Sequence, residues 1–165
     1  MHDGFDDFVR SRSTGLLRVA YLLTGDRHSA EDLVQEVLEQ MYVKWRRIHS
    51  GPEAYARRAL VNRSANRWRR RGRRPEAPLG SHDVAAPDHS EHVVVRDAVL
   101  EALRTLPPRQ RAAVVLRYLE DLPVIEVARA LDCSEGNVKS SVSRGLVRLR
   151  AALGPVTTTT DRGPS

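Results

Sequence analysis

Cysteine, aromatic residues and long apolar runs are scarce in this chain, and each scarcity excludes a class of protein. The chain contains one cysteine, which excludes an internal disulfide and a multi-cysteine zinc site. Aromatic residues make up only 5% of the chain, so any core must be built mainly from leucine, valine and alanine. No apolar run approaches the length of a membrane span, and nothing resembles a signal peptide. The sequence therefore predicts an intracellular, cytoplasmic protein with no membrane insertion.

The sequence motifs of catalysis are also missing. There is no glycine-rich phosphate loop, no nucleophile–base arrangement and no cluster of metal ligands. His82, His89 and His92 could in principle gather a metal, but they fall in a stretch with no ordered scaffold and no cysteine. The sequence therefore predicts a protein that is not an enzyme and that has no catalytic residue, no metal and no cofactor.

Basic residues, in contrast, are abundant. The chain has 27 lysines and arginines against 21 aspartates and glutamates, which gives a net charge of +6. This balance favours a polyanionic partner such as a nucleic acid. The simpler alternative is a generally basic, solvated surface.

Residues 122–150 show the pattern of a helix-turn-helix. Two short helical patterns are separated by Asp132-Cys133-Ser134, and Ser134 is well placed as the N-cap of the second helix. The apolar positions recur at helical spacing in both helices: Val124, Val127, Ala128 and Leu131 in the first, then Val138, Val142, Leu146 and Leu149 in the second. Cys133 is interpreted as a small core residue in the turn.

The polar face of the second helix carries side chains that suit a major groove. Lysine and arginine can donate to guanine, asparagine can bind adenine, and glutamate can accept from cytosine. The predicted DNA-binding residues are Glu135, Gly136, Asn137, Lys139, Ser140, Ser143, Arg144 and Arg148. The alternative is an amphipathic helical hairpin whose outer face is only solvated.

The N-terminal part of the chain reads as three helices, at residues 5–24, about 28–47 and about 53–72. Asp26 is the expected N-cap of the second helix, and Pro52 suits the first position of the third. The second helix has an acidic face formed by Glu31, Asp32, Gln35, Glu36 and Glu39. Such a run is either a solvated helix surface or a docking face for a basic protein partner.

The third helix becomes rich in arginine toward its end, with amides and a tryptophan interleaved. Arginines can contact phosphates, and an indole can stack on an unpaired base for about 1–3 kcal/mol. The predicted nucleic-acid contacts are Asn62, Arg63, Asn66, Arg67, Trp68, Arg69 and Arg70. The alternative is a basic helix end beside a disordered tail, with Trp68 filling a core.

Composition divides the chain into two small helical domains, so the predicted fold class is all-α. Residues 75–92 are rich in proline, glycine, serine and alanine, contain four acids and no lysine or arginine, and read as a flexible acidic linker. The first domain is then 1–74, and the second, which contains the helix-turn-helix, is 93–153. Residues 154–165 read as a disordered tail.

These motifs, in this order and spacing, resemble the extracytoplasmic-function (group IV) sigma factors of bacterial RNA polymerase, within the sigma-70 class. The resemblance is closest to the sigma-E family of actinobacteria. Residues 16–48 and 52–74 resemble the two parts of sigma region 2, and residues 103–153 resemble region 4. A glycine is common in this family where Asp132 stands, and aspartate tolerates the left-handed backbone expected there. Many members carry aspartate at the position of Asn66.

The resemblance assigns partners to each surface. It implies that the chain binds core RNA polymerase, with Asp32, Gln35, Glu36 and Glu39 as contacts for the β′ clamp helices. Region 4 would read the −35 promoter element and meet the β flap. The arginine-rich helix would open and hold the −10 strand. An anti-sigma factor is a further candidate partner.

Two other function classes remain open from the residues alone. A standalone helix-turn-helix repressor or activator would explain residues 122–150, but it leaves the acidic face and the arginine–tryptophan cluster without a role. An enzyme acting on nucleic acid lacks any supporting motif. A pure interaction protein would leave two basic surfaces unexplained.

Overall fold

A computed structural model of the chain describes residues 4–49, 51–72 and 91–154. The elements described there are all helical: α1 (Phe5–Thr24), α2 (Arg27–Lys44), the short 3-10 helix η1 (Trp45–Arg47), α3 (Pro52–Gly72), α4 (Glu91–Arg104), α5 (Pro108–Val114), the π-helical turn η2 (Val115–Leu119), α6 (Val124–Leu131) and α7 (Glu135–Leu153). The predicted all-α class is confirmed. Most of the predicted linker (75–92) and most of the predicted tail fall on residues 73–90 and 155–165, which lie outside the described residues. Glu91 and His92, predicted as the end of the linker, are instead the first residues of α4.

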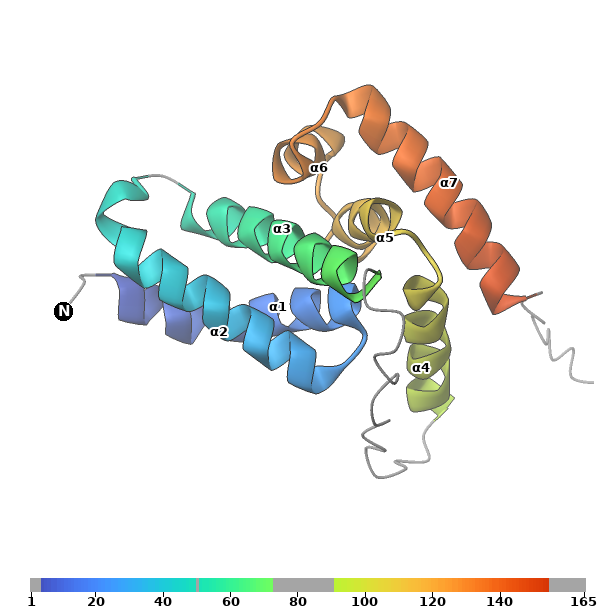
Figure 1. The fold of residues 1–165 in the computed structure, drawn as a ribbon, viewed down its shortest axis with the longest axis horizontal. Helices are drawn as coiled ribbons and strands as arrows, with labels where there is room; N and C mark the ends of the chain where they lie inside the picture. The colour runs from blue at the N-terminus through green and yellow to red at the C-terminus, as the bar shows by residue number, and fades with distance from the viewer. Residues whose placement is uncertain (1–3, 50, 73–90, 155–165) are drawn as a thin grey trace, which may run out of the picture.

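The N-terminal half, α1 to α3, packs around the face shared by α1 and α2 (Figure 1). Gly25 ends α1 at φ +78°, and Asp26 then caps α2 by accepting hydrogen bonds from the backbone N–H groups of His28 and Ser29. Burial opposes the ionisation of Asp26, but the bonds from the Ser29 hydroxyl and from these N–H groups outweigh it, so its pKa is lowered. The N-cap predicted from the sequence is confirmed.

Aromatic residues pack together where the start of α1 meets the end of α2 and η1. The ring of Phe5 meets the rings of Tyr42 and Trp45 edge-on, with centroids 5.3 and 5.2 Å apart, and Phe8 packs against Trp45 at 5.5 Å. Such edge contacts are a favoured geometry for aromatic pairs. The remaining core of this half is aliphatic, with Leu33 and Met41 fully buried.

The C-terminal half, α4 to α7, is built from leucine, valine and alanine. Pro107 and Pro108 begin α5, because a proline suits the first turn of a helix, where its missing N–H costs nothing. The π-helical turn η2 follows α5, and Asp121 then reverses the chain at φ 53°. Leu103, Leu106, Leu116 and Val138 are fully buried between these helices.

The two halves pack against each other through α3, which contacts both α5 and α6 (Figure 1). Buried residues of both halves form one continuous apolar cluster. Arg18 of α1 pairs with Glu120 at 3.1 Å, and Arg58 of α3 pairs with Asp132 at 3.6 Å. In the described residues the molecule is therefore one packed body made of two helical halves.

Arg111 of α5 lies at the junction of the halves and is only 7% exposed. Its guanidinium donates to the carbonyl oxygen of Leu23 at the end of α1, at 2.8 Å, and to those of Leu103, Arg104 and Leu106 at the end of α4. A cation is favoured at the negative end of a helix, and here it meets two such ends. Burial and the nearby charge of Arg104 both lower the pKa of Arg111.

Candidate functional site

Helix α7 presents the polar face predicted for a DNA reader. Ser134 caps it by accepting a hydrogen bond from the backbone N–H of Asn137 at 3.1 Å, as the sequence predicted. Every predicted contact on this helix is exposed, namely Glu135, Gly136, Asn137, Lys139, Ser140, Ser143, Arg144 and Arg148. The opposite side packs inward through the buried Val138 and the partly buried Val142, Leu146 and Leu149.

The turn before α7 adopts the geometry expected of a helix-turn-helix. Asp132 takes the left-handed conformation at φ 52° and ψ 53°, where a glycine would be easiest. Cys133 is partly buried against the core, as predicted. Helix α6 packs against α7, and the polar face of α7 is exposed to solvent.

Gly145 explains how closely α7 approaches α5. A Cβ atom at this position would lie 2.7 Å from Cγ2 of Val114 and 3.3 Å from the carbonyl oxygen of Gln110. Real Cβ atoms essentially never come as close to another heavy atom as the 2.7 Å contact, so the α5–α7 spacing favours glycine here. Gly145 was not among the predicted functional residues, although a glycine in the interior of an otherwise regular helix was a signal that could have identified it.

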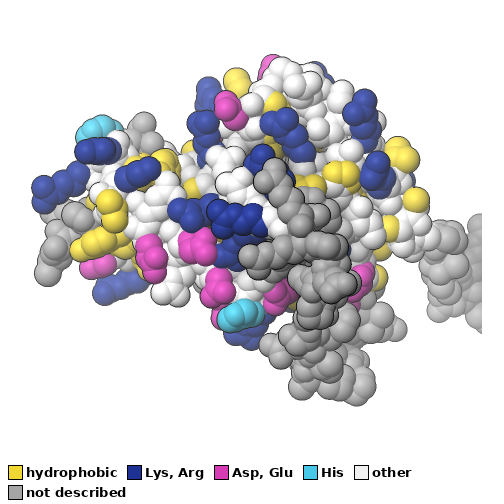
Figure 2. All heavy atoms as spheres, viewed as in Figure 1, with side chains coloured by type: hydrophobic (Ala, Val, Ile, Leu, Met, Phe, Trp, Pro, Cys, Tyr) yellow, Lys and Arg dark blue, Asp and Glu magenta, His cyan; other side chains and the backbone are white. Residues whose placement is uncertain are grey.

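Helix α3 carries the second predicted nucleic-acid surface. Asn62, Asn66, Arg69 and Arg70 are exposed, and Arg69 donates to the amide oxygen of Asn66 at 2.6 Å. Trp68 lies in α3, but its side chain is outside the described part of the chain. Figure 2 shows basic side chains gathered over α3, directly beside acidic side chains over α2.

Two of the predicted contacts on α3 are engaged within the protein. Arg63 approaches one carboxylate oxygen of Glu36 at 3.1 Å, and Arg67 donates to the other. Gln40 of α2 accepts a further hydrogen bond from Arg63 at 2.7 Å and donates to the hydroxyl of Tyr55 at 3.0 Å. Glu36 was predicted as a contact for the polymerase, and in the structure it contacts two arginines of α3.

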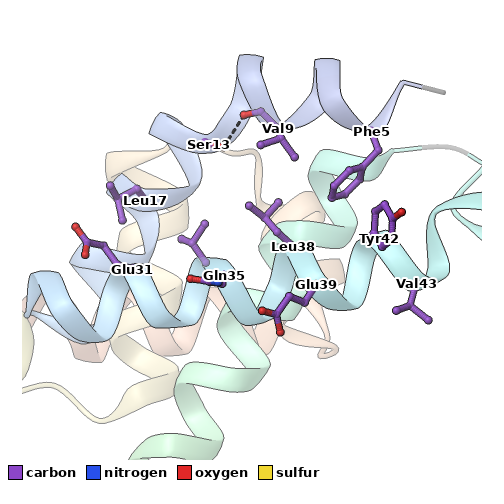
Figure 3. Close-up of a pocket in the computed structure, with 11 residues that line it drawn as sticks. Phe5, Val9, Ser13, Leu17, Glu31, Gln35, Leu38, Glu39, Tyr42 and Val43 are labelled. Carbon is purple, nitrogen blue, oxygen red and sulfur yellow. Dashed lines mark hydrogen bonds between the residues drawn. The ribbon is translucent and has the colours of Figure 1, made fainter. Parts of the chain in front are cut away.

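A groove of about 730 Å³ runs between α1 and α2 (Figure 3). Its floor is apolar, and its rim carries Glu31, Gln35 and Glu39 of α2. The lining residues are Phe5, Val9, Ser13, Leu17, Glu31, Val34, Gln35, Leu38, Glu39, Tyr42 and Val43. Val43 is 81% exposed and Tyr42 46% exposed at its open end.

The groove extends the predicted acidic face. Asp32, Gln35 and Glu39 are exposed on α2, and Asp32 lies 3.5 Å from the imidazole of His28. The polar rim of the groove was predicted from the sequence, but its apolar floor was not. The floor combines residues of two helices, and a pattern read along one helix does not reveal a groove formed between two.

No group of three or more histidine, cysteine, aspartate or glutamate side chains in residues 4–49, 51–72 and 91–154 could hold a metal ion. In the same ranges, none of the helices has the length and hydropathy needed to span a bilayer.

Comparison with known proteins finds two matching family models. Residues 8–74 match sigma-70 region 2, and residues 96–149 match sigma-70 region 4. The first match covers α1 to α3 with the groove and the arginine-rich surface. The second covers the helix-turn-helix and the helices that support it.

Individual relatives agree with these matches. The chain is 37% identical to the RNA polymerase sigma-E factor of Streptomyces coelicolor over 90% of this chain and 85% of that protein. It is 36% identical to the ECF RNA polymerase sigma factor SigE of Mycolicibacterium smegmatis over 90% of this chain and 61% of that protein. Among solved structures, the sigma factor RpoE of Bartonella quintana, crystallised with the anti-sigma factor NepR, matches with a TM-score of 0.70 and 25% identity over 92% of this chain and 98% of that chain. This chain belongs to the sigma-70 family of RNA polymerase sigma factors, within its extracytoplasmic-function group.

Proposed function

We propose that this sigma factor joins core RNA polymerase through the α1–α2 groove, reads −35 duplex DNA with α7 and holds the opened −10 strand on α3. One observation carries the proposal. The chain contains regions 2 and 4 of a sigma-70 factor in order. The exposure of all the predicted contact residues of α7 is consistent with it. The protein is a binding factor rather than an enzyme, and we propose that it acts in the cytoplasm, where polymerase and promoter meet.

The shape and charge of the groove support its role in polymerase binding. An apolar floor flanked by carboxylates suits an amphipathic helix that carries basic residues beside apolar ones. Tyr42 and Val43, which line the groove, are themselves exposed and add apolar surface to it. We assign this surface to the β′ clamp helices, with Asp32, Gln35 and Glu39 on its acidic side. Region 4 would meet the β flap, and an anti-sigma factor is a candidate competitor for these surfaces.

The chemistry of α7 and α3 suits two different forms of DNA. Lys139, Arg144 and Asn137 can donate to base edges in a major groove, and the N-terminal N–H groups of α7 can bind a phosphate. On α3, Asn62 and Asn66 can pair with the edges of unstacked bases, while Arg69 and Arg70 contact the backbone. The first surface reads duplex DNA, and the second needs an opened strand.

The distance between the two promoter elements requires the halves to separate. A compact chain of this length is roughly 40 Å across, since its radius of gyration is about 15 Å. The −35 and −10 positions are about 25 base pairs apart, which is about 85 Å at about 3.4 Å per base pair. The packed body cannot reach both. We therefore propose that it is a resting form, and that contacts between the halves such as Arg58–Asp132 break when polymerase binds.

Run-off transcription tests this function. Core RNA polymerase from Streptomyces coelicolor is supplied with a library of upstream DNA regions, with and without this protein. Transcripts that appear only when the protein is present, and that start below a shared −35/−10 pattern, are the expected result.

Two other results would redirect the assignment. If the protein binds duplex DNA but never changes which transcripts the core enzyme makes, a standalone regulator is the better account. If it neither binds DNA nor joins the core enzyme, the proposed function is wrong.

A further inference from the structure

Side chains that join α2 and α3 by ion pairs were predicted to contact two different partners, the polymerase and the −10 strand. Glu36 was assigned to polymerase, and Arg63 and Arg67 were assigned to the −10 strand. In the structure these three side chains contact one another, and both oxygens of the carboxylate are used. The cluster is thus a direct physical link between the two surfaces.

The cluster is held from several sides. Gln40 accepts hydrogen bonds from Nε and Nη2 of Arg63, at 3.2 and 2.7 Å, and Tyr55 of α3 orients Gln40. Arg67 also donates to the backbone carbonyl of Ser29 at 3.2 Å. Both guanidinium groups are therefore directed toward α2, and fewer of their donors remain available to a phosphate.

The ion pairs of Glu36 with Arg63 and Arg67 are nevertheless exposed enough for another charged group to replace one of the partners. The side chain of Glu36 is 44% exposed, that of Arg63 is 36% exposed and that of Arg67 is 26% exposed. Pairs with this much contact with water contribute little net stability, because solvent and salt screen them. A basic group brought close to Glu36 by a docked partner would compete directly with the two arginines.

We propose that Glu36 shields Arg63 and Arg67 in the free protein and releases them to the phosphates of single-stranded DNA when polymerase binds. This inference rests on the proposed function, because it takes the docked partner to be the core enzyme. Glu36 is then a positioning residue, which acts on DNA through the two arginines. The release makes strand capture depend on polymerase, since the free factor offers a carboxylate where the holoenzyme offers two cations.

The test measures binding of the full-length free protein to a fluorescent oligothymidylate of about 12 nucleotides, the span of a small single-strand site. Fluorescence anisotropy is recorded between about 50 and 200 mM salt. The variant Glu36→Gln should bind about three- to tenfold more tightly than the wild type at the lowest salt concentration. The slope of log K against log salt should steepen by up to about 1.4, because each of two new phosphate contacts adds about 0.7.

A matched control separates release of these arginines from a change in net charge. Glu101→Gln removes the same charge and breaks the 3.3 Å pair with Arg104, and both residues lie on α4, outside the proposed binding surfaces. It should leave both affinity and slope near the wild-type values. Replacing Arg63 and Arg67 by glutamine in the Glu36→Gln protein should abolish its gain.

A variant of opposite sign covers the case in which Glu36→Gln folds poorly. Gln40→Glu places a second carboxylate beside Arg63, so it should weaken oligonucleotide binding and flatten the slope. Thermal unfolding followed by circular dichroism verifies that each variant is folded. In the holoenzyme, permanganate footprinting should show that Arg63→Gln with Arg67→Gln impairs opening of the −10 region. In the free protein the same double change should weaken oligonucleotide binding only modestly, to about the level of Gln40→Glu.

Two results overturn the proposal. An unchanged affinity and slope in folded Glu36→Gln would mean that the arginines are not shielded. Weaker binding would mean that Glu36 orients them for DNA already in the free protein. The proposed function is tested separately by run-off transcription with the wild type. Promoter-specific transcripts would support that function even if the shielding proposal fails, and their absence would contradict the function itself.

Discussion

The two basic helices of this sigma factor differ in what surrounds their cationic side chains. On α7, Lys139, Arg144 and Arg148 are exposed to solvent on the side away from the core. On α3, Arg63 and Arg67 contact a carboxylate of the neighbouring helix α2. The cationic groups of α7 are thus exposed to solvent, whereas two of those on α3 form ion pairs with α2, the helix that we assign to polymerase binding.

This contrast fits the DNA that each helix is proposed to bind. A −35 element is read as an intact duplex, so its reader needs no change before binding. A −10 strand exists only after the duplex opens, and extruding its bases costs a few kcal/mol. A reader that withholds its charge until polymerase is present would avoid unproductive binding to other single strands.

The largest expected effect tests the residue that joins the halves. Arg111→Met should lower the free energy of unfolding by about 2–4 kcal/mol, because buried carbonyl groups at the ends of α1 and α4 lose a charged donor. Urea denaturation measures the loss. Arg109→Met, on the same helix, removes a single bond to the carbonyl of Leu131 and should cost no more than about 1 kcal/mol. Equal losses in the two variants would contradict the role given to Arg111.

The exposed surface of α7 gives the next effect. Lys139→Ala and Arg144→Ala should each weaken binding to promoter duplex by about 1–3 kcal/mol, because each removes a donor to a base edge or phosphate. Titration of a labelled −35 duplex at several salt concentrations measures this. Arg150→Ala, in the last turn of the same helix, is the matched control and should change affinity little. An unchanged affinity and salt slope in both variants would remove α7 as the reader.

A pair of glycines should show opposite effects in the two halves. Gly145→Ala should destabilise the protein by about 1–3 kcal/mol, because the new methyl group would collide with the stiff side chain of Val114. Gly15→Ala lies in the middle of α1 with nothing within 4 Å, and it should stabilise the protein by about 0.5–1 kcal/mol. Differential scanning calorimetry of both variants checks the signs. A stabilising Gly145→Ala would contradict the close approach of α5 and α7.

The smallest effect concerns the cap of α2 and its dependence on pH. Asp26→Ala should cost about 1 kcal/mol at neutral pH, whereas Asp26→Asn keeps a good cap and should cost less. Since the folded-state pKa of Asp26 is lowered, its charge contributes stability above the unfolded-state pKa of about 4. That contribution disappears as the pH falls through the folded-state value. Unfolding across this acid range should therefore bring the wild type closer to Asp26→Asn, and a constant gap would contradict the lowered pKa.

Most of the fold was predictable from local patterns. The spacing of apolar residues predicted the first three helices and the helix-turn-helix, and the caps at Asp26 and Ser134 fixed where two helices begin. These features depend on residues within one or two turns of each other. The left-handed turn at Asp132 was predicted from a resemblance to the family and is confirmed.

Contacts between distant elements were not predictable. Arg111 reads in the sequence as one more cation on a helix, but the fold buries it against the ends of α1 and α4. Glu36 and Arg67 are 31 residues apart, and nothing in either local pattern indicates that they meet. The predicted DNA and polymerase contacts stay predictions, because each needs a partner to test it.

The uneven distribution of aromatic residues allows unfolding of the N-terminal half to be followed separately by intrinsic fluorescence. Both tryptophans, Trp45 and Trp68, lie in the N-terminal half, and from residue 75 onward Tyr118 is the only aromatic residue. Tryptophan emission therefore follows the N-terminal half alone, whereas the far-ultraviolet circular dichroism of the helices follows both halves. Coincident melting curves by the two methods would mark the halves as one cooperative unit, and a gap between the curves would give the temperature range over which they separate.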